Sequence, residues 1–180
     1  MTYCLAINLK QGLVFCSDSR TNAGMDNVST YSKMHTFIWP GDRVFVLLSA
    51  GNLATTQAVV KRMNRDVEQE VEPNLRSMAS LHEAADYVGV ISTDLQRLYA
   101  SRDIASTNFE ASFIFGGQIR NAAPEIFMIY PQGNYVHESD EHPYLHRRLF
   151  LSCDASRWPQ FRVSAGQQLR SRIATRSALR

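Results

Sequence analysis

The alternation of hydrophobic and polar side chains at the start of the chain predicts a β-hairpin. Residues 2–9 alternate in character, which places odd-numbered and even-numbered side chains on opposite faces of a strand. Gln11-Gly12 is a turn signal, and residues 13–17 form a second strand-like run directly after it. We therefore expect the two strands to pair, with the end of the second beside the start of the first.

Apolar runs further along the chain predict more strands. They lie at residues 36–39, 44–48, 111–115, 126–130 and 134–136. Turns are expected at Gly116-Gly117 and at Gln132-Gly133, where glycine allows the chain to reverse. The polar residues 21–29 are interpreted as a loop.

Two helices are predicted between these groups of strands. Asn52 is a favourable N-cap, and apolar side chains recur every three or four residues from there to Val67. Ser80 and Glu83 form a capping box that opens a second helix, which ends near Ser101. Strands followed by a helix pair and then by more strands predict an α+β layered domain rather than alternating βαβ units.

Composition limits the class of protein. A chain of 180 residues suits one domain with a real core. No segment has the pattern of a signal peptide, and no apolar run approaches membrane-spanning length. Three cysteines without metal spacing indicate a reducing compartment, and Cys4 and Cys16 are expected to be small buried hydrophobic residues. We expect a cytoplasmic protein that does not associate with membranes.

The net charge of +2 hides two unlike segments. Up to residue 145 the acidic residues exceed the basic ones by five, whereas the remainder carries eight Arg, no Lys and one acid, Asp154. An Arg-rich stretch without periodicity is typical of a GC-rich gene read out of frame. The sequence therefore predicts a folded domain at 1–144 and an atypical tail at 145–180, disordered or out of frame after a frameshift near residue 145.

Four polar features suggest a hydrolytic site. Thr2 follows Met1, and removal of Met1 would leave an α-amine, with an ordinary pKa of about 7.7–8.0, beside a hydroxyl. Lys33 would lower the pKa of that hydroxyl, and Asp18 would keep the lysine charged and oriented. Gly51, between a buried strand and a helix, would bring a backbone N–H close to an oxyanion.

The motifs around these residues resemble those of the proteasome-type threonine proteases, which are N-terminal-nucleophile hydrolases, and in particular their bacterial Anbu (ancestral β-subunit) branch. The similar segments are Met1-Thr2-Tyr3-Cys4, residues 12–15, Ser17-Asp18-Ser19-Arg20 with residues 21–24, Lys33-Met34, residues 41–44, residues 48–53 and residues 111–119. The resemblance covers about residues 1–144 and ends abruptly after Tyr144.

The resemblance implies a function and a set of site residues. The expected reaction is hydrolysis of peptide bonds through an acyl-enzyme on Thr2, with no metal and no cofactor. It implies catalytic roles for Thr2, Asp18, Lys33 and Gly51, and substrate contacts for Arg20, Thr21, Ala23 and Ser49. Peptides or unfolded proteins are the implied substrates, with no nucleic acid or membrane partner, and the sequence identifies no unfoldase partner.

The resemblance also implies an architecture. Such chains fold as a four-layer αββα sandwich and assemble into homo-oligomeric rings or open helical rings. Because the similarity stops near residue 145, we expect the sandwich to be incomplete at its C-terminal end. A sheet face that lacks its helix layer would expose a large apolar patch.

Other interpretations stay open at the level of the sequence. The chain could be a defective, truncated proteasome-like subunit without activity, or a small domain whose Arg-rich tail binds nucleic acid. Asp18 with Arg20 could be a surface ion pair, Lys33 a solvated cation and Gly51 part of a plain helix cap. Cys4, on the face of Thr2, is a weaker candidate nucleophile, and residues 137–142 are a weak candidate metal site.

Overall fold

The computed structural model of the chain describes residues 2–22, 28–102, 107–139 and 144–149. Within these ranges the elements are β1 (Thr2–Leu9), β2 (Gly12–Ser17), β3 (Arg20–Asn22), β4 (Val28–Thr30), β5 (Met34–Trp39), β6 (Arg43–Gly51), α1 (Leu53–Glu68), α2 (Leu81–Ala100), β7 (Ala111–Ile119), β8 (Glu125–Ile129), β9 (Tyr135–His137) and β10 (Tyr144–Leu149). No helix in these ranges is long and apolar enough to cross a membrane.

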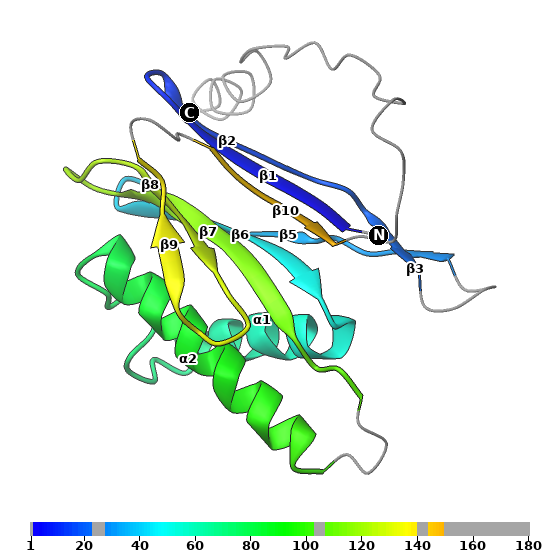
Figure 1. The fold of residues 1–180 in the computed structure, drawn as a ribbon. Helices are drawn as coiled ribbons and strands as arrows, with labels where there is room; N and C mark the ends of the chain where they lie inside the picture. Colours follow the sequence, from blue (N-terminus) through cyan, green and yellow to red (C-terminus); the bar gives the residue numbers. More distant parts are fainter. Residues whose placement is uncertain (1, 23–27, 103–106, 140–143, 150–180) are drawn as a thin grey trace, which may run out of the picture.

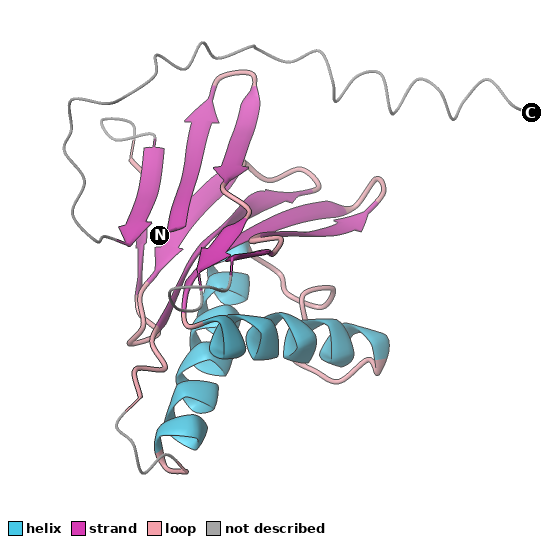
Figure 2. Ribbon diagram, turned by 90° about the vertical axis from the view of Figure 1, so that its right-hand side faces the viewer, coloured by secondary structure: helices cyan, strands magenta, loops and turns pink. Residues whose placement is uncertain are grey.

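The strands form two facing sheets and a small hairpin. Strands β5-β6-β7-β8-β9 form an antiparallel sheet in that order, and β10-β1-β2 form a second one. Strands β3 and β4 pair only with each other. Both helices lie against the outer face of the five-stranded sheet, and the three-stranded sheet covers its inner face (Figures 1 and 2). The α+β sandwich predicted from the sequence is confirmed.

Local capping signals fix where the helices begin, as the sequence predicts. The Asn52 side chain accepts a hydrogen bond from the backbone N–H of Thr55 at 3.1 Å, which satisfies one free donor of α1. Ser80 does the same for the N–H of Glu83 at 3.2 Å. The Glu83 carboxylate reaches back to the N–H of Ala79 at 2.9 Å, so the first turn of α2 is held from both sides.

Two apolar cores hold the layers together. Between the helices and the five-stranded sheet, the core includes the rings of Phe45, Phe113, Phe115 and Phe127 and several aliphatic side chains of α1 and α2. The core between the two sheets consists of Cys4, Ala6, Leu48, Ile114, Ile126 and Met128. The first core is larger because it packs two helices on a sheet.

The face of β1 that packs inward is the one with the smaller side chains. Cys4 and Ala6 are 1% and 0% exposed, which allows β1 to lie close to the five-stranded sheet. The larger side chains of β1 face the other way, where Leu9 is 44% exposed. Among the described residues, neither helix lies over this outer face (Figure 2). The described part of the chain therefore contains three of the four expected layers.

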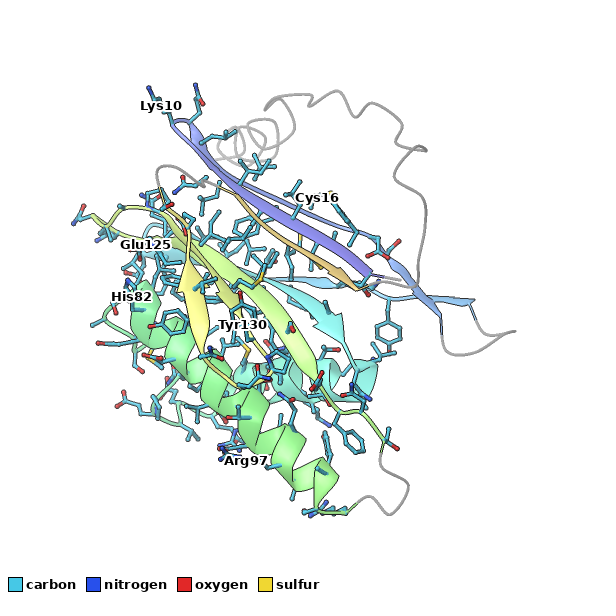
Figure 3. The ribbon with its side chains drawn as sticks, in the orientation of Figure 1. Lys10, Cys16, His82, Arg97, Glu125 and Tyr130 are labelled. Carbon is cyan, nitrogen blue, oxygen red and sulfur yellow. The ribbon has the colours of Figure 1, made fainter. Side chains whose placement is uncertain are left out.

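Three local predictions are wrong. Residues 21–29 were expected to be a loop, but strands β3 and β4 include parts of this segment. Gly116 and Gly117 lie within β7 and do not form a turn. A Cβ on Gly116 would lie 2.7 Å from the Glu125 carbonyl oxygen and 3.0 Å from the Phe15 ring, so glycine there permits close strand and sheet packing. Cys16 is exposed on the sheet farthest from the helices (Figure 3).

The sequence did not predict β10. It pairs antiparallel with β1, with Leu145 opposite Ala6, and makes β1 the central strand of its sheet. The boundary predicted after residue 144 falls at the first residue of this strand. Residues 150–180, which include most of the predicted tail, lie outside the described residues.

Candidate active site

A buried lysine, Lys33, contacts two other polar residues that the sequence singled out, Thr2 and Asp18. Lys33 precedes β5, and its Nζ donates hydrogen bonds to Asp18 Oδ2 at 2.7 Å and to Thr2 Oγ1 at 3.1 Å. Its side chain is 8% exposed, whereas that of Asp18 is 32% exposed. Because a buried ammonium group is costly without partners, this pairing accounts for a charged lysine at this position. The cation therefore lies within hydrogen-bond reach of the threonine hydroxyl.

Hairpin register places Asp18 beside the start of the chain. Cys4 lies opposite Ser17 in the β1–β2 ladder, so Asp18, the residue after Ser17, lies beside Tyr3. The backbone N–H of Tyr3 donates to Asp18 Oδ1 at 2.7 Å, and the N–H of Asp18 donates to the Tyr3 carbonyl at 3.0 Å. One carboxylate oxygen thus fixes the backbone after Thr2, while the other accepts from Lys33.

Two backbone contacts bring Lys33 to this point. After strand β4 the chain lies beside the residue that follows Asp18, because the N–H of Tyr31 donates to the Ser19 carbonyl at 2.8 Å. The Lys33 carbonyl then accepts from the N–H of Ser49 at 2.9 Å and from its hydroxyl at 3.4 Å. Ser49, predicted to contact substrate, also anchors the backbone of the lysine.

Gly51 ends β6 in a conformation that favours glycine. Its φ is +112°, and a Cβ at this position would collide with the carbonyl of Glu110 on the neighbouring chain segment. Asn52 and the N-terminus of α1 follow directly after this turn. The backbone N–H groups and the helix dipole there favour negative charge. This arrangement suits stabilisation of an oxyanion.

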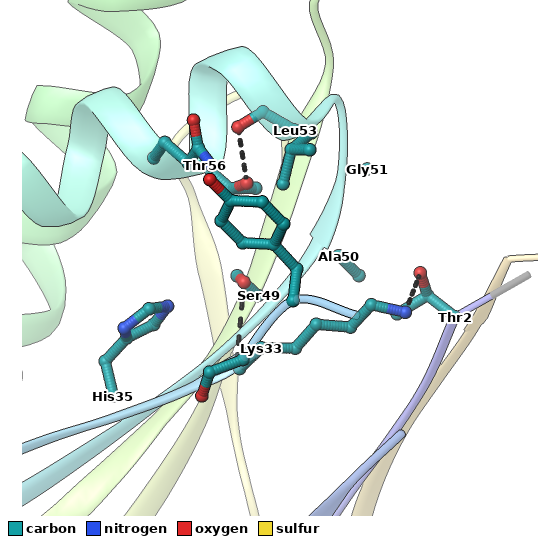
Figure 4. A pocket seen from close by; sticks show the side chains of 11 residues that line it. Thr2, Lys33, His35, Ser49, Ala50, Gly51, Leu53 and Thr56 are labelled. Carbon is teal, nitrogen blue, oxygen red and sulfur yellow. Dashed lines mark hydrogen bonds between the residues drawn. The ribbon is translucent and has the colours of Figure 1, made fainter. Parts of the chain in front are cut away.

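These residues share a small pocket of about 60 Å³. Its lining comprises Thr2, Tyr31, Ser32, Lys33, His35, Ser49, Ala50, Gly51, Leu53, Thr56 and Gln57. Figure 4 shows Thr2 at one end of the pocket and His35 at the other. Three of the four predicted catalytic residues, Thr2, Lys33 and Gly51, therefore line this pocket. The fourth, Asp18, forms an ion pair with Lys33.

Sequence reasoning missed several lining residues, although periodicity could have found two of them. His35 is two residues after Lys33 and therefore lies on the same side of an extended chain. Gln57 is one helical turn after Leu53 at the start of α1. Burial lowers the pKa of His35 below its ordinary value of 6.5, so its ring is neutral at pH 7.

The remaining predicted substrate contacts are only partly described. The backbone of Arg20 and Thr21 belongs to β3, which lies between Asp18 and the return of the chain to Lys33. Ala23 lies outside the described residues.

The alternative nucleophile and the alternative metal site receive no support. The Cys4 thiol is buried, and desolvation together with the nearby Asp18 raises its pKa to about 12 against the opposing effect of Lys33, so it is protonated at neutral pH. No group of three or more His, Cys, Asp or Glu residues is placed to hold a metal ion within the described ranges. Asp140, Glu141 and His142, which make up half of the candidate metal segment, lie outside those ranges.

The family comparison agrees with this geometry. Residues 2–140 match the family described as "Proteasome subunit". The fold and the match together show that the chain belongs to the proteasome subunit family. No curated protein matches the chain.

Within that family the chain is similar to Anbu, the ancestral β-subunit. Anbu from Yersinia bercovieri is 40% identical with a TM-score of 0.75, and the match covers 81% of this chain and 60% of that one. A mutant Anbu (Gly-1) from Hyphomicrobium sp. strain MC1 is 41% identical with a TM-score of 0.73, covering 82% and 60%. The helically assembled Anbu complex from Pseudomonas aeruginosa is 36% identical with a TM-score of 0.77, covering 81% and 60%.

The resemblance predicted from the sequence motifs is therefore confirmed. The chain spans about 60% of the length of the Anbu chains that it matches.

Proposed function

We propose that the chain is a threonine-type endopeptidase subunit whose nucleophile is the hydroxyl of Thr2 after removal of Met1. The observation that carries the proposal is the contact of the buried Lys33 ammonium with both Asp18 and Thr2 Oγ1. A cation 3.1 Å from a hydroxyl stabilises the alkoxide that develops as the hydroxyl loses its proton. A structural lysine would need the carboxylate but would not need the threonine.

Thr2 and Gly51 have defined roles in the proposed reaction. The α-amine of Thr2 accepts the proton of its own hydroxyl, and Oγ1 attacks the carbonyl carbon of the scissile peptide bond. The Gly51 N–H, beside the N-terminus of α1, stabilises the oxyanion of the tetrahedral intermediate. The amine then protonates the leaving nitrogen, which leaves an ester on Thr2 that water hydrolyses.

The substrate is an extended peptide or an unfolded protein segment. Strand β3 begins two residues after Asp18, and we propose that a peptide pairs with its backbone around Thr21 by strand addition. Arg20, Ala23 and Ser49 are the further residues proposed to contact the peptide. We further propose that copies of the chain assemble into a homo-oligomeric ring or open helical ring in the cytoplasm. The helical assembly of the Pseudomonas aeruginosa Anbu complex supports the assembly proposal.

A second candidate function is a proteasome-like subunit that is catalytically defective. It is favoured by the outer face of β1 and β2, which no described helix covers. In this case the polar residues would be present without an α-amine that is held in position.

Intact-mass spectrometry before and after incubation with a peptide epoxyketone separates the two candidates. This warhead reacts with both the hydroxyl and the free amine of an N-terminal threonine. We expect loss of Met1 and one adduct, localised to Thr2 by fragmentation, with no adduct on a Thr2→Ala control. Retention of Met1, or loss of Met1 without an adduct, would argue against the peptidase and for the defective subunit.

A further inference from the structure

The pocket beside Thr2 continues along helix α1 into a second hollow. This hollow, about 420 Å³ in volume, shares His35 and Gln57 with the first pocket. Its other lining residues are Val60, Lys61, Asn64, Arg65 and Glu68, all on α1. The two hollows therefore adjoin each other at His35 and Gln57.

The charged groups around the two hollows are mainly positive. No carboxylate lines the pocket at Thr2, where Lys33 is the one charged lining residue among those described. The second hollow has Lys61 and Arg65, with Glu68 at the last turn of α1 as its one described carboxylate. Successive residues rise about 1.5 Å along a helix, so Lys61 lies about 6 Å beyond Gln57 and Glu68 about 10 Å beyond Lys61. The basic groups are therefore closer to Thr2.

Neutral hydrogen-bond donors lie where the two hollows meet. The ring of His35 is half-buried and forms no hydrogen bond with another described residue, and the Gln57 side chain is exposed to the hollow. Each can donate an N–H to an oxygen that enters the pocket. Lys61 forms no ion pair with any described residue, so its charge is available to a ligand.

We propose that this pocket selects an acidic side chain, preferably glutamate, in the residue before the cleaved bond. The inference rests on the proposed peptidase function and specifies its substrate class. His35 and Gln57 donate to the carboxylate, and Lys61 supplies the attractive charge. Arg65 lies beyond Lys61 and is already paired with Asp66 at 3.6 Å. Lysine or arginine in the same place would meet like charge, and leucine would leave the two donors without partners.

The experiment compares four peptides that differ only in the residue before the cleaved bond: glutamate, glutamine, leucine and lysine. We expect kcat/KM for glutamate to exceed that for isosteric glutamine by about two- to fivefold, which is the range expected for a partly exposed charge pair. The ratio should fall as salt is raised. Equal rates for glutamate and glutamine, or faster cleavage after lysine or leucine, would overturn the proposal.

Two variants isolate the charge on α1. Lys61→Glu should abolish or reverse the preference for glutamate over glutamine. Lys10→Glu makes the same change of charge at the exposed β1–β2 turn, far from α1, and should leave the preference intact (Figure 3). An unchanged preference in the Lys61→Glu variant would contradict the role of this lysine, provided that circular dichroism shows both variants folded.

A binding measurement keeps this test separate from the proposed function. Fluorescent product-like peptides that end in glutamate, glutamine or leucine are titrated into the Thr2→Ala variant, which needs no catalysis. Two- to fivefold tighter binding of the glutamate peptide supports the pocket even if the wild-type chain forms no epoxyketone adduct. Absence of binding, or binding without preference, overturns the acidic pocket even if the adduct on Thr2 forms.

Discussion

At the scale of single residues, the site depends on one buried cation. The Lys33 ammonium donates to a carboxylate and to the Thr2 hydroxyl, while the Asp18 carboxylate also accepts from the backbone of Tyr3. Without the lysine, the Asp18 carboxylate would lose a partner, but it is 32% exposed and water can solvate it. Loss of the lysine therefore costs less folding free energy than it would if Asp18 were fully buried. The loss should therefore affect the reaction more than the stability.

Lys33→Ala should slow the formation of the epoxyketone adduct on Thr2 by about 10²-fold or more, because positioned charge of this kind typically contributes that much. The rate of adduct formation is measured by mass spectrometry, with Lys10→Ala as the control. If Lys33→Ala reacts at the wild-type rate while it is folded, Lys33 is not part of the catalytic site.

The two described cysteines should differ in reactivity. Burial and the nearby Asp18 raise the pKa of Cys4 from its ordinary 9.0 to about 12, whereas Cys16 is exposed. Brief treatment of the native protein with iodoacetamide at pH 8 should therefore alkylate Cys16 and spare Cys4, as read from peptide masses. Alkylation of Cys4 at a similar rate in the native protein would contradict its burial.

The raised pKa of Cys4 also sets a direction for stability against pH. Its folded-state pKa lies above the unfolded value, so the neutral thiol is favoured by folding. This contribution is fully present below about pH 9 and is lost progressively as the pH rises toward 12.

At the scale of elements, the turn between β6 and α1 determines where the proposed oxyanion site can form. The sequence predicts the helix cap at Asn52 but gives no measure of how tightly the turn is packed. In the structure, Gly51 combines a positive φ with close approach to the Glu110 carbonyl. Either feature alone would favour glycine, and together they leave little room for any other residue.

Gly51→Ala should therefore cost more stability than Gly12→Ala. Gly12 also has a positive φ, +138°, but a Cβ there would meet no atom within 4 Å. In both variants, alanine at a positive φ costs about 1 kcal/mol or more in conformational strain. Only at Gly51 does the collision of the new Cβ with the Glu110 carbonyl add to this cost. Urea unfolding should show the difference, and Gly51→Ala should also lose adduct formation. Equal destabilisation of the two variants would show that the turn can relax.

At the scale of the whole molecule, the outer face of the three-stranded sheet is the unusual feature. Leu9 and Val14 on β1 and β2 are 44% and 38% exposed, and no described helix covers them. Exposed apolar side chains on a sheet face favour association with another surface. The proposed assembly and this face both predict that the chain does not remain a monomer.

Light scattering coupled to size-exclusion chromatography should give a molar mass several times that of the 20.4 kDa chain. A Leu9→Ser, Val14→Thr double variant tests the origin of the association. It should reduce non-specific aggregation while leaving a defined oligomer in place, because neither residue lies near the candidate active site. A monomeric wild-type chain at micromolar concentration would contradict the proposed ring or helical ring.

Local patterns in the sequence determined much of this protein. The alternation along β1, the caps at Asn52 and Ser80 and the order of the elements all depend on neighbouring residues, and they predicted the hairpin, the helices and the α+β class. The motifs around Thr2, Asp18, Lys33 and Gly51 carry the resemblance that predicted the family. The hairpin register alone places Asp18 beside the strand that Thr2 begins.

Only the tertiary structure decided which surfaces meet. It buried the small side chains of β1, kept Gly116 inside a strand, added β10 beside β1 and connected the pocket at Thr2 to Lys61 through His35 and Gln57. These features join segments far apart in the chain. Their energies depend on packing across sheets and helices, so periodicity and capping within a short window could not predict them.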